Sequence, residues 1–246
     1  MLQLTRIQKI YRTELIETHA LRELSLSVKA GEFVAVTGPS GSGKTTFLNI
    51  VGLLETFEQG TYMLDGKDVS RLNDDERSSF RNQKIGFIFQ SFNLIPDLNL
   101  FENIDVPLRY RGLSAGDRKQ RIENALETVG LASRQRHIPA QLSGGQQQRV
   151  AIARALAGDP KVLLADEPTG NLDTMMAHQV MELLEQIHAT GTTIVMVTHD
   201  SDLAMRAERN IHLVDGRVFA EETSEAQEET AHIARLNGGA ALAAQI

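Results

Sequence analysis

The eight residues Gly38-Pro39-Ser40-Gly41-Ser42-Gly43-Lys44-Thr45 match the pattern G-x-x-x-x-G-K-[ST]. They lie directly between a strand-like apolar run, Phe33 to Thr37, and a helical run, Thr46 to Leu54. In such a loop the glycines let backbone N–H groups turn toward phosphate oxygens, and the helix start adds the positive end of its dipole. The sequence therefore predicts a phosphate-binding loop, with Lys44 reaching the β- and γ-phosphates and the Thr45 hydroxyl binding Mg²⁺.

The rest of the chain has the rhythm of an α/β protein, because short runs rich in Val, Ile and Phe recur between longer helical patterns. Alternating apolar residues near the N-terminus predict antiparallel strands with one exposed face. Between Ser91 and Pro160 helical patterns replace the strand signal, which predicts a helical insertion. Strands of a mainly parallel sheet are predicted at Phe33 to Thr37, Lys84 to Phe89, Lys161 to Asp166, Thr192 to Thr198 and Asn210 to Val214.

Composition narrows the classes of function. The 246 residues include 25 Lys+Arg against 32 Asp+Glu and no Cys, which excludes disulfides, zinc-thiolate sites and thiol catalysis. No apolar run reaches the roughly 18 residues of a membrane span, and charges interrupt the first twenty residues, so we expect a cytosolic protein. The acidic balance argues against bulk nucleic-acid binding, although it leaves a local basic patch open.

The last 26 residues, 221–246, differ from the rest. A block of glutamates precedes an Ala/Gly-rich end with few aromatic residues. Such composition is typical of a solvated appendage, so we expect a mobile tail or a loosely docked helix.

A second acidic element ends the apolar run Val162 to Ala165. A carboxylate at the carboxyl end of a parallel strand faces the crevice where open α/β sheets bind ligands. Asp166 could hold Mg²⁺ there, directly or through water, and Glu167 could polarise the attacking water. The alternative is that these are two ordinary acidic residues at the start of a loop. The presence of a phosphate-binding loop in the same chain makes that alternative much weaker.

The third element is Ser143-Gly144-Gly145-Gln146, after Leu142 and before an Ala/Ile/Leu-bearing helix. Ser143 is a good N-cap, and the two glycines expose backbone N–H groups, so this is a second anion site at a helix start. One nucleotide does not need two such sites far apart in the chain. We therefore expect the second site to meet the γ-phosphate held by another copy, in a homodimer that closes around two nucleotides.

Together these elements resemble the nucleotide-binding subunit of an ABC transporter. Gly38 to Thr45, Leu142 to Gln146 and Leu163 to Pro168 stand in the family's order, and Gly170-Asn171-Leu172-Asp173 follows them. The match covers about residues 1–220. It implies a P-loop NTPase with a RecA-like α/β core, an N-terminal antiparallel β subdomain and a helical subdomain at about 91–160, with 221–246 as the tail.

The resemblance also implies roles for single residues. Gln90 would sense the γ-phosphate through Mg²⁺, His199 would contact that phosphate, and Asp173 would cross the dimer interface. Tyr11 resembles the aromatic residue that stacks on adenine, with an ordinary edge-strand tyrosine as the alternative. The expected nucleotide-binding set is Tyr11, Gly38, Pro39, Ser40, Gly41, Ser42, Gly43, Lys44, Thr45 and Thr46, with Ser143, Gly144, Gly145, Gln146 and Asp173 contributed to a second copy's nucleotide.

Finer similarity points to the bacterial lipoprotein-releasing, macrolide-exporting (MacB-like) and cell-division ATPases. This implies ATP hydrolysis coupled to a separate membrane permease with an extracytoplasmic region, for export or mechanotransmission, on the cytoplasmic face of the membrane. Phe92 to Pro96 and Leu100 to Asn103 are candidates for the permease groove, with ordinary packing as the alternative. A soluble ABC ATPase without a membrane partner remains the rival, although it usually carries a long coiled coil or two cassettes.

Overall fold

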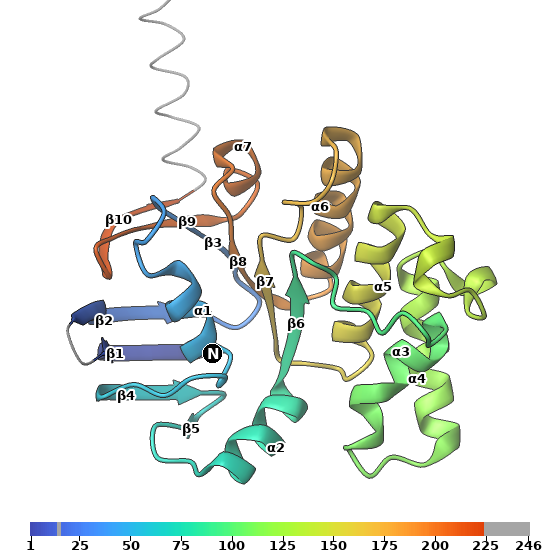
Figure 1. The fold of residues 1–246 in the computed structure, drawn as a ribbon, viewed down its shortest axis with the longest axis horizontal. Coiled ribbons are helices and arrows are strands. Elements are labelled where there is room, and N and C mark those ends of the chain that lie inside the picture. Colours follow the sequence, from blue (N-terminus) through green and yellow to red (C-terminus); the bar gives the residue numbers. More distant parts are fainter. Residues whose placement is uncertain (14–15, 224–246) are drawn as a thin grey trace, which may run out of the picture.

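The computed structural model describes residues 1–13 and 16–223 (Figure 1). The expected mobile tail therefore lies largely outside the described residues. Its first three residues, 221–223, belong to a strand, β10 (Arg217–Thr223), which pairs antiparallel with β9 (Arg209–Val214).

A six-stranded sheet in the order β10-β9-β3-β8-β7-β6 forms the centre of the molecule. Its five strands from β9 to β6 are parallel, and β10 is an antiparallel edge. The predicted α/β sheet is confirmed, and the five predicted strands agree with it to within a residue at each end. The remaining bounds are β3 (Phe33–Thr37), β6 (Ile85–Phe89), β7 (Val162–Asp166) and β8 (Thr193–Val197).

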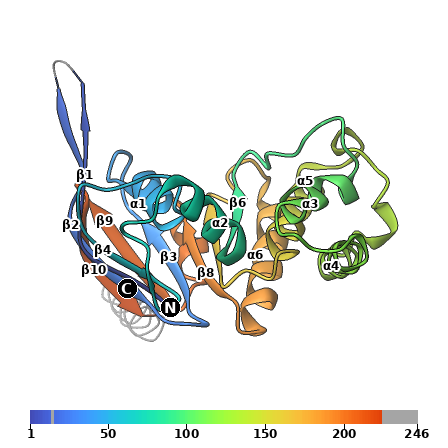
Figure 2. The same ribbon diagram turned by 90° about the horizontal axis from the view of Figure 1, so that it is seen from below.

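A second, antiparallel sheet in the order β2-β1-β4-β5 contains the N-terminus, as the alternating pattern predicted. A hairpin formed by β1 and β2 projects beyond the body of the molecule (Figure 2). The strands are β1 (Leu2–Arg12), β2 (Glu17–Val28), β4 (Gln59–Leu64) and β5 (Lys67–Asp68).

Helices cover the central sheet on both faces, and its strands alternate between two cores. In β3, Val34 and Val36 pack with α1 (Lys44–Val51) and the antiparallel sheet, whereas Phe33 and Ala35 pack with the helical segment. That segment contains α3 (Leu100–Arg109), α4 (Ala115–Thr128) and α5 (Gly144–Leu156), with short 3₁₀ turns at Ala132–Arg134 and Pro139–Gln141, and packs beside α6 (Thr174–Ala189). The remaining helices are α2 (Asp74–Lys84) and the short α7 (Ser201–Ala204).

Among the described residues, no helix has both the length and the apolar character that crossing a membrane would require.

Candidate nucleotide site

The glycine-rich loop joins β3 to α1 at the carboxyl edge of the central sheet, where parallel sheets bind their ligands. Gly38 and Gly43 adopt φ angles of +145° and +99°, which side-chain-bearing residues rarely adopt. A Cβ atom on Gly38 would lie 2.1 Å from the Leu213 carbonyl oxygen, so the loop lies directly against β9. The Lys44 ammonium donates hydrogen bonds to the carbonyls of Gly38 (2.8 Å) and Pro39 (2.9 Å), which places it over the loop.

A cavity of about 570 Å³ opens over this loop, a volume suited to a nucleotide. Besides the loop residues and Thr46, it is lined by four predicted site residues from other parts of the chain: Tyr11, Asp166, Glu167 and His199. Residues separated by more than 180 positions in the sequence thus meet around one space. Of the predicted loop residues, Pro39 and Ser42 do not line the cavity, and Ser42 is buried.

Asp166 and Glu167 stand at the end of β7, between β6 and β8. Burial raises the pKa of Asp166, and the neighbouring Glu167 carboxylate raises it further, against the opposing effect of Lys44. Glu167 has a φ of +44°. Its Oε1 lies 3.1 Å from His199 Nδ1, and the two side chains are 25% and 68% exposed. A solvent-accessible carboxylate therefore lies beside an imidazole at the mouth of the cavity.

The donor set at the cavity fits Mg²⁺. This ion is commonly held by one or two carboxylates together with substrate phosphates rather than by an all-protein cage. Thr45 and Asp166 both line the cavity, and residues 1–13 and 16–223 contain no cluster of three or more His, Asp or Glu that could hold a metal alone. A cation there would relieve the unfavourable burial of the Asp166 charge.

Gln90 follows β6 and stands beyond Phe89, whose register partner on β7 is Asp166. Its backbone carbonyl accepts a hydrogen bond from Asn171 Nδ2 (3.0 Å), and its Nε2 donates to Asn171 Oδ1 (3.4 Å). Gln90 itself does not line the cavity. Asn171, to which sequence reasoning gave no separate role, therefore links Gln90 to the loop after Glu167.

Tyr11 lies on β1 and is 41% exposed. Its hydroxyl donates a hydrogen bond to Glu55 Oε2 (2.7 Å), and Lys9 Nζ lies 5.1 Å from the centre of its ring. Lys9 and Glu55 form an ion pair of 3.1 Å. Neither Lys9 nor Glu55 was predicted from the sequence. The one signal that could have found Lys9 is that a lysine stands inside an alternating apolar run.

The residues Ser143 to Gln146 lie elsewhere. Ser143 caps α5: its Oγ accepts a hydrogen bond from the Gln146 amide (3.4 Å), and Gln146 Oε1 accepts one from the Ser143 amide (3.1 Å). Ser143, Gly145 and Gln146 line a separate cavity of about 300 Å³. Asp173 caps α6 through a 2.8 Å hydrogen bond from the Met176 amide. Within one chain, neither group enters the cavity over the phosphate-binding loop.

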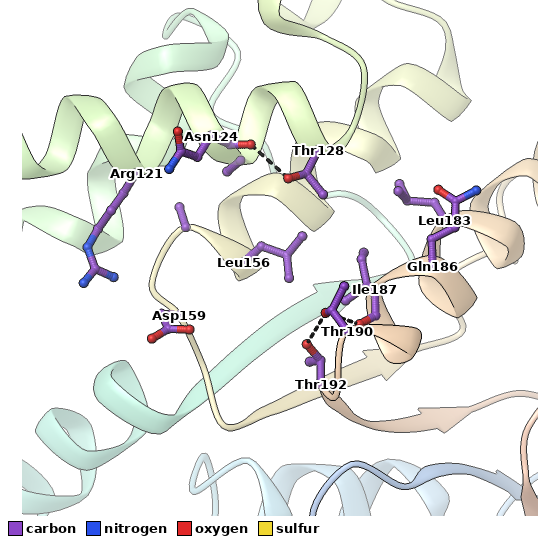
Figure 3. A pocket seen from close by; sticks show the side chains of 12 residues that line it. Arg121, Asn124, Thr128, Leu156, Asp159, Leu183, Gln186, Ile187, Thr190 and Thr192 are labelled. Atoms are coloured by element: carbon purple, nitrogen blue, oxygen red, sulfur yellow. Dashed lines mark hydrogen bonds between the residues drawn. The ribbon is translucent and has the colours of Figure 1, made fainter.

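A larger cavity, of about 660 Å³, lies between α4 and α6 (Figure 3). Figure 3 shows Arg121 and Asn124 on one side and Gln186 and Ile187 on the other. Thr192, immediately before β8, places this cavity at the amino edge of the sheet. No predicted site residue lines it.

A groove of about 630 Å³ runs between β6, α2 and α3. Of the segments predicted as a permease groove, only Asn93 lines it. The prediction is wrong for Leu100 and Asn103, which are buried. Asn103 faces inward because its amide hydrogen-bonds backbone groups of the preceding loop, including the Ile95 amide (2.7 Å) and the Leu98 carbonyl (2.9 Å).

Comparison with known proteins shows the family to which this chain belongs. The ABC transporter family model matches residues 21–170. The chain belongs to the ABC transporter ATP-binding family, whose members are ATPases. It is 46% identical over 218 residues to the ABC transporter ATP-binding protein YknY of Bacillus subtilis, covering 89% of this chain and 95% of that protein.

Two further comparisons give one longer relative and one dimeric structure. The macrolide export ATP-binding/permease protein MacB of Brucella melitensis is 45% identical over 91% of this chain, which spans only 34% of MacB. The dimeric ATP-binding cassette MJ0796, solved bound to ADP and Pi, is 44% identical, with a TM-score of 0.83 over 91% of this chain and 99% of that one.

Proposed function

We propose that this chain hydrolyses MgATP as a homodimer and thereby drives a separate membrane permease. The observation that carries the catalytic part is the single cavity that brings Lys44, Asp166, Glu167 and His199 together. Phosphoryl transfer needs positioning and charge stabilisation more than covalent chemistry. Lys44 and the loop amides would neutralise the phosphates, and the Glu167 carboxylate would orient the attacking water and accept its proton.

Other residues of the site would bind Mg²⁺ or contact the nucleotide. Thr45 and Asp166 would hold Mg²⁺, which when bound supplies positive charge against the β- and γ-phosphates. Gln90 would join them by turning its side chain from Asn171 toward the cavity. His199, 3.1 Å from Glu167, would contact the γ-phosphate and steady the carboxylate. Tyr11 would stack on the adenine at the outer end of the cavity.

The positions of the remaining residues support completion of the site by a second copy. Ser143 is an exposed helix cap and Asp173 another, and both lie outside the cavity that holds Lys44. Backbone amides at the start of α5 are suited to a γ-phosphate, so each cavity would be closed by Ser143 and Gly145 of a second copy. The dimeric state of the relative MJ0796 supports this arrangement.

The permease is proposed to dock in the groove between β6, α2 and α3. Tyr110, 82% exposed, lines this groove together with Phe87 and Phe89 from the strand before Gln90. A membrane subunit seated there would contact the segment that leads to the γ-phosphate. The MacB relatives, which are ATP-binding/permease proteins, support such a partner, for export or mechanotransmission at the cytoplasmic face of a bacterial membrane.

Capture from membranes tests the partner. Tagged Glu167→Gln protein, crosslinked in its native host with ATP present, should retain a membrane protein with a large extracytoplasmic region. Tyr110→Ser in that background should lose the capture. Phe219→Ser is the matched control, because Phe219 is 76% exposed but lies on β10, outside the groove. Recovery of soluble proteins or nucleic acid alone, despite good capture, would contradict the transport role.

A further inference from the structure

Gln148 is a fully buried amide in the middle of α5. Its Nε2 lies 2.6 Å from the Pro168 carbonyl oxygen and 3.4 Å from that of Phe89. Both neighbours are acceptors, so the amide nitrogen must face them and can donate one hydrogen to each. Among the described residues its Oε1 is buried without a hydrogen-bond partner. The side chain is therefore held in place from the nitrogen side.

The two carbonyls belong to the segments that carry the proposed chemistry. Phe89 is the last residue of β6 and immediately precedes Gln90. Pro168 immediately follows Glu167. Phe89 and Asp166 are also register partners in the central sheet. One buried amide thus links the backbone just before Gln90 to the backbone just after Glu167.

A second side chain of α5 fixes the segment beyond Gln90. Arg154 donates hydrogen bonds to the Phe92 carbonyl (2.8 Å) and to that of Asn93. Phe92 and Asn93 have φ angles of +59° and +50°, so this turn has an unusual backbone that the guanidinium holds from α5. The chain around Gln90 is therefore attached to α5 both before and after that residue.

We propose that Gln148 is a positioning residue that transmits the placement of α5 to Gln90 and Glu167. The same helix begins at Ser143, the cap expected to meet the second copy's nucleotide, and Gln148 lies little more than one turn further along. Closure of the dimer on Ser143 would therefore set the positions of the metal-sensing glutamine and the general base together. This inference rests on the proposed function of those residues.

Replacement by an apolar residue of similar length tests the proposal. Gln148→Met removes both donors while keeping the volume, so the two backbone segments lose their link. We expect kcat to fall about 10- to 100-fold, because shifts near 1 Å at reacting groups have such effects. The Kd for ATP should change less than about twofold, since the phosphate-binding loop keeps its contacts. The Mg²⁺ concentration for half-maximal turnover should rise.

Tyr62→Phe is the matched control for a purely structural loss. Tyr62 is also fully buried, and its hydroxyl donates to a backbone carbonyl, that of Val51 (2.9 Å), away from the cavity. It should lower the melting temperature and leave kcat unchanged. If Gln148→Met also lowers only the melting temperature, or weakens ATP binding without changing kcat, the proposal is overturned.

Two further variants keep the test decisive. Should Gln148→Met fail to fold, Gln148→Asn keeps the amide but is one methylene too short to bridge both carbonyls, and it should show the same split between kcat and Kd. In a Gln90→Ala background the effect of Gln148→Met on kcat should shrink, because the two residues act on one step; full additivity would contradict the route through Gln90. Unchanged turnover of Glu167→Gln would refute the proposed function itself, separately from Gln148.

Discussion

Gly38→Ala perturbs the contact that sets the phosphate-binding loop against β9. An alanine Cβ would lie 2.1 Å from the Leu213 carbonyl oxygen and 2.8 Å from Ser42 Oγ. Leu213 belongs to β9, which is paired on both sides in the central sheet, so the carbonyl cannot swing away as a side-chain end could. An ordinary contact begins near 3.4 Å, so the loop must move by about 1.3 Å.

The expected loss follows from that displacement. A shift of about 1 Å in the groups that position the phosphates costs on the order of 100-fold in turnover. The unfavourable φ of +145° adds roughly 1–3 kcal/mol of lost folding stability. Steady-state ATPase rates measure the first effect, and thermal unfolding monitored by circular dichroism measures the second.

Gly66→Ala separates backbone strain from displacement of the loop. Gly66 lies in the turn between β4 and β5 with a φ of +76°, and an added Cβ would meet nothing within 4 Å. This variant should lose about 1 kcal/mol of stability and keep its turnover. If Gly38→Ala retains wild-type turnover, or loses no more turnover than Gly66→Ala does, contact of the loop with β9 does not position the phosphates.

Other predictions concern the two ends of the cavity. Tyr11→Phe removes only the hydroxyl that donates to Glu55, so the Kd for ATP should stay within about twofold. Tyr11→Ala removes the ring, and calorimetry should show a loss of about 1–3 kcal/mol of ATP-binding free energy. Equal ATP affinities of the two variants would refute stacking. Because burial raises the pKa of Asp166, turnover should fall as the pH drops through a value above the ordinary aspartate range, and extra Mg²⁺ should move that fall to lower pH. Asp166→Asn should lose turnover but raise the melting temperature of the nucleotide-free protein at neutral pH. The pKa of Asp166 is higher in the folded than in the unfolded protein, so at a pH above both pKa values its ionised carboxylate lowers the stability of the fold. A lower melting temperature of the variant would contradict this.

Much of the site was predictable because its residues follow buried strands. Gln90 follows β6, Asp166 ends β7, and His199 follows β8 by two residues. Parallel strands bring their carboxyl ends to one edge, which explains why these residues gather there. Only Asp166 was predicted from its strand, whereas Gln90 and His199 were named from the family resemblance. The glycine-rich loop joins the same edge for the same reason.

Contacts between distant segments were not predictable. The pairing of Tyr11 with Glu55, and of Gln148 with two backbone carbonyls, depends on how a sheet and a helix meet in space. The burial of Leu100 and Asn103 depends likewise on which side of α3 faces its neighbours. Helical periodicity shows that a face is apolar but does not identify what covers it.

The start of the acidic tail could not be located from amino-acid composition. Glutamates from Glu221 onward indicate a solvated segment, yet Glu221 lies in β10 and pairs with Arg209 on β9 at 2.9 Å. An edge strand with an exposed face accommodates charged side chains as readily as a tail does. Composition alone therefore placed the end of the folded core a few residues too early.

In the proposed dimer, Ser143 of one copy completes the cavity built around Lys44 and Glu167 of another. The most direct measurement is the mass of Glu167→Gln protein in solution, by light scattering, with and without MgATP. A monomer that becomes a dimer with MgATP, and that stays monomeric when Ser143→Arg is added although ATP still binds, is the predicted result. A protein that binds MgATP and remains monomeric, or that still dimerises with Ser143→Arg, would show that Ser143 does not complete the cavity of a second copy.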